Sequence, residues 1–149
     1  MKKLIVLVLF IAAFGTSGFS QLKFGAGANL LFDGTLFGVG GRVQYAINED
    51  FAAQGGLNIF LDDVADYMID LDVYYSGFEL GDVEGFSLTP FAGLNIFRAS
   101  VLGFGATDTG LTLGIQGLLP ITDGLNLYVE PRLYLGGGDG FGISAGVYF

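Results

Sequence analysis

The sequence alternates between large apolar residues and small or polar residues along most of its length. In residues 141–149 the even positions are Gly142, Ser144, Gly146 and Tyr148, and the odd positions are all apolar: Phe141, Ile143, Ala145, Val147 and Phe149. A period of two predicts a β-strand with two different faces. Seven further segments have the same pattern: 22–32, 36–47, 51–61, 68–77, 86–98, a sixth marked by Leu111, Leu113, Ile115 and Leu119, and 125–134.

Turn residues separate these segments. Asp33-Gly34 and Asp123-Gly124 are strong signals for hairpin turns. Acidic residues fill the connection 62–66, glycines dominate 136–140, and longer connections are expected at 78–85 and 99–108. Strands of roughly 9 to 12 residues match the length that crosses a bilayer at a tilt of about 45°. Short connections favour an up-and-down antiparallel order.

The charged residues within the segments lie on the face opposite the large apolar row. They are Lys23, Arg42, Asp70, Asp72, Glu130 and Arg132, whereas Arg98, at a segment end, has the apolar parity. A soluble barrel has the reverse arrangement, with apolar side chains inside. The sequence therefore predicts an all-β fold, an eight-stranded antiparallel up-and-down transmembrane β-barrel with lipid around it.

The aromatic residues support a membrane setting. An alternating up-and-down path places Phe24, Tyr45, Phe51, Tyr75 and Phe149 outward at one end, and Phe37 and Phe141 outward at the other. Two such rows are typical of the girdles at membrane interfaces. The final strand should pair with the strand that begins near Leu22, because an open edge in lipid would leave backbone groups unsatisfied.

The inward face predicts a lumen filled by paired charges. Three cations and three anions can pair in a barrel that is just wide enough for its own side chains, and inward glycines leave room for the long ones. A structural plug is favoured over a gated ion path. Pro131 conflicts with a mid-strand position because it lacks a backbone donor, so we expect a bulge or a nearer strand end there.

Composition separates the first twenty residues from the rest. Lys2 and Lys3 precede an apolar stretch and a small-residue region that ends before Gln21, as in a cleavable signal peptide. Residues 1–20 are thus a predicted signal peptide and residues 21–149 a single barrel domain. The predicted mature chain has four basic and fifteen acidic residues, a net charge of about −11, which argues against a nucleic-acid partner.

The residue types limit the chemistry. The chain contains no His and no Cys, which excludes a Ser-His-Asp triad and a thiolate nucleophile. Asp70 and Asp72 could act as an acid/base pair, but charge balance with the arginines is favoured. The acidic connection with Asp62, Asp63 and Asp66 lacks the spacing of a calcium loop, and the glycine-rich stretches lack the context of phosphate loops. Arg98 could contact a lipopolysaccharide phosphate.

The stretches LTPFAGLNI (88–96) and LPITDGLNLYVEPR (119–132), together with the strand that ends at Phe149, carry a family resemblance. The chain resembles the OmpA/OmpX-like family of small outer-membrane barrels, and in particular the porin-like "outer membrane beta-barrel" proteins of Bacteroidota. The resemblance implies that outer-membrane assembly machinery and periplasmic chaperones recognise the final strand as an assembly signal (Phe141, Ile143, Ala145, Val147, Phe149). Barrel enzymes of this family, such as the lipid A palmitoyltransferase, use a His that is absent here.

We therefore expect a non-enzymatic, monomeric barrel in the bacterial outer membrane that contacts membrane lipid and lipopolysaccharide, binds no cofactor or metal, and contributes to envelope structure or surface contact. A narrow porin-like channel for ions or small solutes is the alternative. A soluble lipocalin-like carrier is a second alternative, but it requires large apolar residues at inward positions that hold Gly25, Gly40, Gly114 and Gly146.

Overall fold

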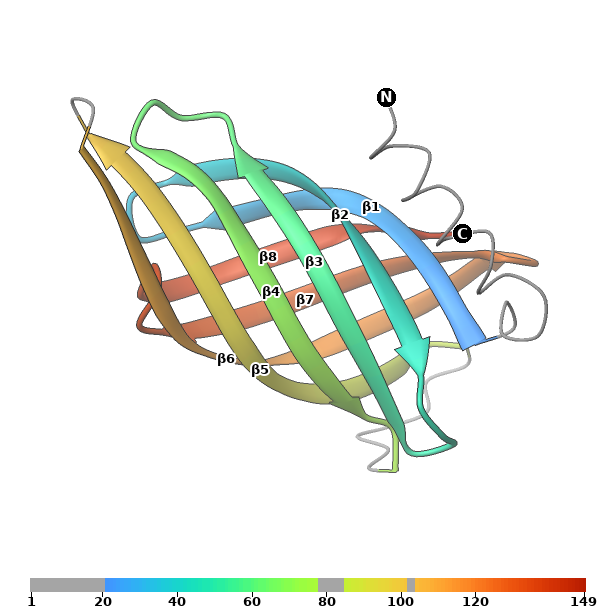
Figure 1. Cartoon of the computed structure of the whole chain (residues 1–149). Coiled ribbons are helices and arrows are strands. Elements are labelled where there is room, and N and C mark those ends of the chain that lie inside the picture. Colours follow the sequence, from blue (N-terminus) through green and yellow to red (C-terminus); the bar gives the residue numbers. More distant parts are fainter. Residues whose placement is uncertain (1–20, 78–84, 102–103) are drawn as a thin grey trace, which may run out of the picture.

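Eight antiparallel strands close into a barrel in the computed structural model, which describes residues 21–77, 85–101 and 104–149 (Figure 1). The strands are β1 (Leu22–Leu31), β2 (Leu36–Ala46), β3 (Phe51–Phe60), β4 (Ala65–Tyr75), β5 (Ser87–Val101), β6 (Phe104–Thr122), β7 (Leu125–Leu135) and β8 (Gly140–Tyr148). This confirms the predicted fold class. The predicted signal peptide and positions 78–84 of the predicted link lie outside the described residues.

Within the described ranges, no helix combines the length and the apolar character needed to cross a membrane.

The first and last strands close the sheet, as the sequence predicted. The β1–β8 ladder runs from Gly25↔Tyr148 to Leu31↔Gly142. Beyond its end, the backbone amide of Phe149 donates to the carbonyl of Phe24 at 2.8 Å. Every strand therefore has a neighbour on both sides, which satisfies its backbone groups within the sheet.

The two ends of the barrel differ in the strand ends and connections that lie there (Figure 1). The termini end, at the right of the figure, has the start of β1, the end of β8 and the β2–β3 and β6–β7 connections. The opposite end has the β1–β2, β3–β4, β5–β6 and β7–β8 connections. The β1–β2 turn contains the predicted Asp33-Gly34, and Gly34 has a φ of 100°, a value that favours glycine.

The longest hairpin differs from the prediction. The segment 99–108 was expected to be a loop, but β5 and β6 pair as far as Val101↔Phe104. The sequence pattern failed here because Gly105, Ala106, Thr107 and Asp108 provide no apolar row to mark a strand. All four residues are exposed, and backbone pairing continues the hairpin through them without an apolar face.

The start of β4 is also earlier than predicted. The strand begins at Ala65 rather than at Met68, and its register with β5 shifts between Ala65 and Tyr67. Asp66 occupies this irregularity, which interrupts the alternation from which the strand start was predicted. Part of the predicted acidic loop is therefore strand.

Pro131 produces a gap in the ladder instead of a bulge. The β6–β7 ladder passes from Gly114↔Arg132 to Gly117↔Val129 with no paired residues between them and no change of register. On the other side, Pro131 stays in register with Ile143 of β8. The prediction of a bulge or a nearer strand end was wrong, because the missing donor removes local pairing with one neighbour only.

The glycines of β2 provide a matched test of the inward packing. A methyl group at Gly40 would lie 2.2 Å from the carbonyl oxygen of Leu57, whereas the nearest atom to one at Gly41 would be 3.7 Å away. Gly40→Ala should therefore destabilise the barrel by about 1–3 kcal/mol, as overpacking does. Gly41→Ala should change stability by less than about 0.5 kcal/mol, as surface substitutions do. Urea unfolding of the detergent-solubilised barrel checks both; equal midpoints for the two variants would contradict this packing.

Candidate functional site

The wall of the barrel has a polar inner face and an apolar outer face. Arg42, Asp70, Asp72, Glu130 and Arg132 are all buried inside. Their strand neighbours point outward and are exposed: Leu71, between the two aspartates, is 53% exposed, and Leu133, next to Arg132, is 43% exposed. In β4 and β7, successive side chains thus alternate between the charged interior and the apolar outer surface.

Arg132 is the centre of the charge cluster. Its Nη2 donates to Glu130 Oε2 at 2.6 Å and to Asp72 Oδ2 at 3.0 Å. Its Nε donates to the same Glu130 oxygen at 3.0 Å, and its Nη1 lies 3.5 Å from Asp70 Oδ1. One fully buried guanidinium therefore contacts three carboxylates from two strands.

Arg42 binds the same Glu130 oxygen as Arg132 does. Its Nη1 donates to Glu130 Oε2 and its Nη2 to Ser144 Oγ, both at 2.7 Å. The second oxygen of Glu130 accepts from Gln116 Nε2 at 2.7 Å and from the Tyr74 hydroxyl at 3.1 Å. Glu130 thus has donors at both oxygens, as a buried carboxylate requires.

Aromatic rings support both guanidinium groups. Arg132 Cζ lies 4.7 Å from the centroid of the Phe91 ring, and Arg42 Cζ lies 4.1 Å from that of Tyr128. These are distances at which a cation is attracted to the face of a ring. Glycines make the space: a methyl group at Gly114 would lie 2.4 Å from Phe91, and one at Gly25 would lie 2.9 Å from the Tyr148 ring.

Lys23 lies apart from the other five predicted charges. It is exposed near the start of β1, and no salt bridge joins it to an acidic group within the described residues. The enclosed cluster therefore has two cations and three anions, rather than three of each. The alternation of the sequence predicted that Lys23 lies on the inward face. Alternation does not show how close a position is to the rim of the barrel.

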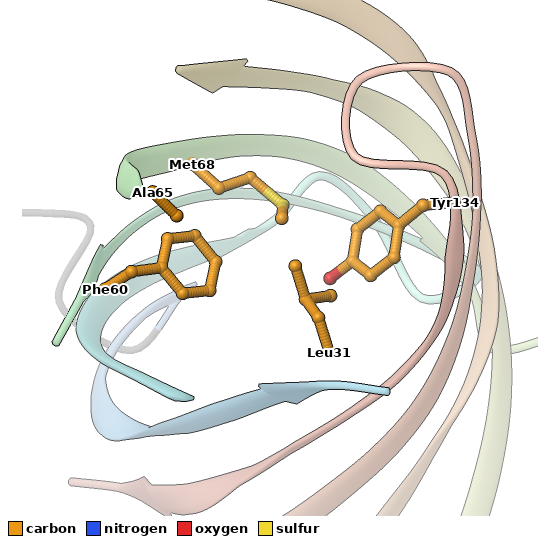
Figure 2. Packing of buried hydrophobic residues seen from close by; sticks show 5 residues of the cluster. All are labelled: Leu31, Phe60, Ala65, Met68 and Tyr134. Atoms are coloured by element: carbon orange, nitrogen blue, oxygen red, sulfur yellow. The ribbon is translucent and has the colours of Figure 1, made fainter. Parts of the chain in front are cut away.

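Apolar side chains close the lumen at the opposite end (Figure 2). Met68 and Tyr134 point toward each other across the interior, and Leu31, Phe60 and Ala65 fill the space around them. We call these five residues the apolar cap. Sequence reasoning missed the cap because it assigned large apolar residues to the outer face, although Leu31 and Phe60 have the inward parity of their strands.

The glycine-rich β7–β8 connection is tied to the barrel interior. Asn95 Nδ2 donates to the carbonyl of Gly137, and the Gly137 amide donates to Asp108 Oδ2 at 3.1 Å. Gly137 is buried with a φ of 61°. These bonds hold the connection against the ends of β5 and β6, on the same side as the apolar cap.

A polar cavity of about 220 Å³ opens at the termini end. Its lining includes Lys23, Gln44, Tyr74, Thr89 and Gln116. Below it, the Tyr148 hydroxyl donates to Gln54 Oε1 at 2.5 Å and accepts from Gln116 Nε2 at 3.1 Å. The cavity therefore ends at a hydrogen-bonded layer, and Gln116 of this layer also donates to Glu130 of the enclosed cluster.

The remaining predicted residues lie at the surface. In β8 and just after it, the side chains of the predicted assembly signal share the outward parity, with Phe141 and Phe149 exposed at opposite ends. Asp66 accepts from Ser100 Oγ at 2.5 Å and lies 3.5 Å from Arg98, while Asp62 accepts from the Val64 amide.

Among the described residues, no group of three or more acidic, His or Cys side chains is placed to hold a metal ion.

Comparison with known proteins gives fold relatives only. No protein-family model matches the sequence, and no curated protein matches it significantly. The N-terminal β-barrel domain of Pseudomonas aeruginosa OprF superposes with a TM-score of 0.69 and 17% identity, over 87% of this chain and 97% of that domain. This similarity confirms, at the level of the fold, the resemblance to small barrels expected from the sequence.

Two other solved barrels are more distant. Ail, the attachment invasion locus protein of Yersinia pestis, has a TM-score of 0.48 and 15% identity over 87% of this chain and 97% of its own. Neisserial surface protein A has a TM-score of 0.47 and 18% identity over 86% of this chain and 93% of its own.

Removal of the central guanidinium tests the cluster. Arg132→Met should destabilise the barrel by about 3–5 kcal/mol, because it leaves buried carboxylates without their cation. Arg98→Met, at an exposed pair, should cost less than about 1 kcal/mol. Urea midpoints in detergent measure both. If Arg132→Met fails to fold, the triple variant that adds Asp72→Asn and Glu130→Gln should restore folding. Two outcomes would contradict the role of the cluster: failure of that rescue, or equal losses of stability for Arg132→Met and Arg98→Met.

Proposed function

We propose that the protein is an integral barrel of the bacterial outer membrane. The observation that carries this proposal is the reversed polarity of the wall: paired charges are buried in the lumen, while Leu57, Ile59, Leu71, Leu94 and Leu111 are about half exposed on the outside. In water, such an outer face would be an apolar patch far larger than monomeric soluble proteins tolerate. In a bilayer, it faces hydrocarbon.

Aromatic residues at both ends of the outer face fit this placement. At the termini end Phe51 and Tyr75 pack with ring centroids 5.0 Å apart, and Tyr45 and Phe149 are exposed. At the opposite end Phe32 and Phe141 stack at 5.6 Å. The two sets lie where the lipid headgroups of each leaflet would be. Contact with membrane lipid and lipopolysaccharide follows from this placement.

The closed lumen favours a structural role over transport or catalysis. Arg132 and Glu130 have no solvent-accessible surface, and the apolar cap and the Tyr148–Gln54–Gln116 layer lie on the two sides of the cluster. We therefore propose a non-enzymatic, monomeric barrel with a plugged lumen that contributes to envelope structure or surface contact. Export by the N-terminal signal peptide, and assembly of β8 by periplasmic chaperones and the barrel assembly machinery, belong to the same proposal.

Reconstitution tests the proposal. Full-length protein expressed in a Gram-negative host should fractionate with outer membranes, lose its N-terminal segment, require detergent for extraction and show a heat-modifiable gel mobility. In planar bilayers it should give no steady conductance. Recovery in the soluble fraction would refute the membrane placement, and a conductance altered by Arg42→Ala or Asp70→Ala would replace the plug with a narrow channel.

A charge on the outer face distinguishes lipid from water as the surrounding solvent. Leu71→Arg should reduce the stability of the vesicle-inserted barrel by about 2–4 kcal/mol, the cost of arginine near the bilayer midplane. Leu61→Arg, on the β3–β4 connection, should cost no more than about 1 kcal/mol, since positions near the interface tolerate charge. Urea unfolding from vesicles measures both; equal tolerance of the two arginines would be the behaviour of a barrel in water.

A further inference from the structure

The enclosed charge cluster does not balance. The guanidinium groups of Arg42 and Arg132 face the carboxylates of Asp70, Asp72 and Glu130, and each of these residues is at least nine-tenths buried. Lys23, the remaining cation predicted for the lumen, is exposed at the termini end. With all five groups ionised, one negative charge is left inside the barrel. An uncompensated charge in such an interior costs several kcal/mol.

Four oxygen atoms beside this excess charge have no hydrogen-bond partner within the described residues. They are Asp70 Oδ1, Asp72 Oδ1, Asn95 Oδ1 and Thr112 Oγ1, from residues that are 2% exposed or less. The other polar atoms of the first three residues are engaged: Asp70 Oδ2 accepts from Asn58, Asp72 Oδ2 accepts from Arg132, and Asn95 Nδ2 donates to backbone carbonyls. These bonds fix the three side chains and leave one oxygen of each without a hydrogen bond. Of these oxygens, Asp70 Oδ1 keeps its ion pair with Arg132 Nη1 at 3.5 Å.

The strand register places the four residues together on the inner wall. Asp70 is paired with Asn95 across β4 and β5, and Asp72 is paired with Gly93. Gly93 is in turn paired with Thr112 across β5 and β6. All four side chains therefore rise from the same face of three adjacent strands, which are separated by about 4.8 Å.

Gly93 makes the space between them. A methyl group at this position would lie 2.3 Å from Asp72 Oδ1, so that oxygen lies directly over the glycine, between Asp72 and Thr112. Any larger residue at position 93 would displace the carboxylate. The unused oxygen of Asp72 thus points across β5 toward the strand that carries the unpartnered hydroxyl.

We propose that these four oxygens bind one small monovalent cation such as Na⁺. Carboxylate, amide and hydroxyl oxygens are the donors that hard cations prefer. A single positive charge neutralises the cluster, whereas a divalent ion would reverse its sign. The positive charge of Arg132, whose Nη1 is 3.5 Å from Asp70 Oδ1, is already included in the sum of charges of the cluster. The inference rests on the proposed closed barrel, because an open lumen would be balanced by bulk ions.

Refolding in defined salts tests the site. The barrel purified from membranes in nonionic detergent is unfolded in urea and refolded in NaCl or choline chloride at equal ionic strength. Above the dissociation constant, each tenfold increase in Na⁺ at constant ionic strength should raise the folded-to-unfolded ratio about tenfold. Choline, which is too large for the site, should have no such effect. Equal urea midpoints in the two salts would overturn the proposal.

Matched variants locate the effect. Asp72→Asn neutralises the cluster and should abolish the Na⁺ response while the barrel still refolds in choline. Thr112→Val removes one neutral ligand and should shift the response to higher Na⁺. Asp66→Asn, outside the lumen, should respond as the wild type does. An unchanged Na⁺ response in Asp72→Asn would overturn the site.

Heat-modifiable mobility and vesicle insertion are measured on the same samples. Their loss would refute the membrane barrel, whereas intact insertion without a Na⁺ response refutes the cation site alone.

Discussion

Closure of an eight-stranded sheet constrains every other part of this structure. Pairing of β1 with β8 leaves no free edge, and it encloses a lumen so narrow that side chains must fill it. The inward face therefore combines large residues with glycines at matching places: Phe91 lies over Gly114, and Tyr148 lies beside Gly25. Where the interior is charged, the same narrowness brings Arg132 into contact with three carboxylates at once.

The interior has three parts along its length. The apolar cap and the glycine-rich β7–β8 connection lie at the opposite end, the charge cluster lies in the middle, and a small polar cavity opens at the termini end. The last part gives access to polar groups from outside. This arrangement accounts for a proposed role in which the outer surface and the connections, rather than the lumen, meet other molecules.

Period-two alternation was sufficient to predict the fold and the inward face of Arg42, Asp70, Asp72, Glu130 and Arg132. It worked well in β7 and β8, where Tyr128, Glu130, Arg132 and Ser144 alternate with outward-facing apolar residues. It failed where backbone pairing continues without an apolar row, as in the extended β5–β6 hairpin, and at Pro131, where a missing donor was expected to deform the strand. These outcomes depend on neighbouring strands that a single segment does not reveal.

The candidate site was predicted by residue but not by arrangement. Parity predicted the inward faces of Asp70, Asp72 and Glu130. The exclusion of Lys23, however, depends on its position at the rim, and the placement of Asn95 and Thr112 on the same part of the inner wall depends on register across three strands. The apolar cap was missed for a related reason. Leu31 and Phe60 have inward parity, but their chemistry suggested the outer face.

Single cysteines along β8 test the central claim most directly, because the chain contains no cysteine of its own. Positions 143, 145 and 147 are each labelled with a spin label in vesicles, and collision rates with a lipid-soluble and a water-soluble relaxing agent are compared. The proposed membrane barrel predicts that labels at Ile143, Ala145 and Val147 collide with the lipid-soluble agent only. Odd positions that collide with the water-soluble agent would show an outer face in water and contradict the account.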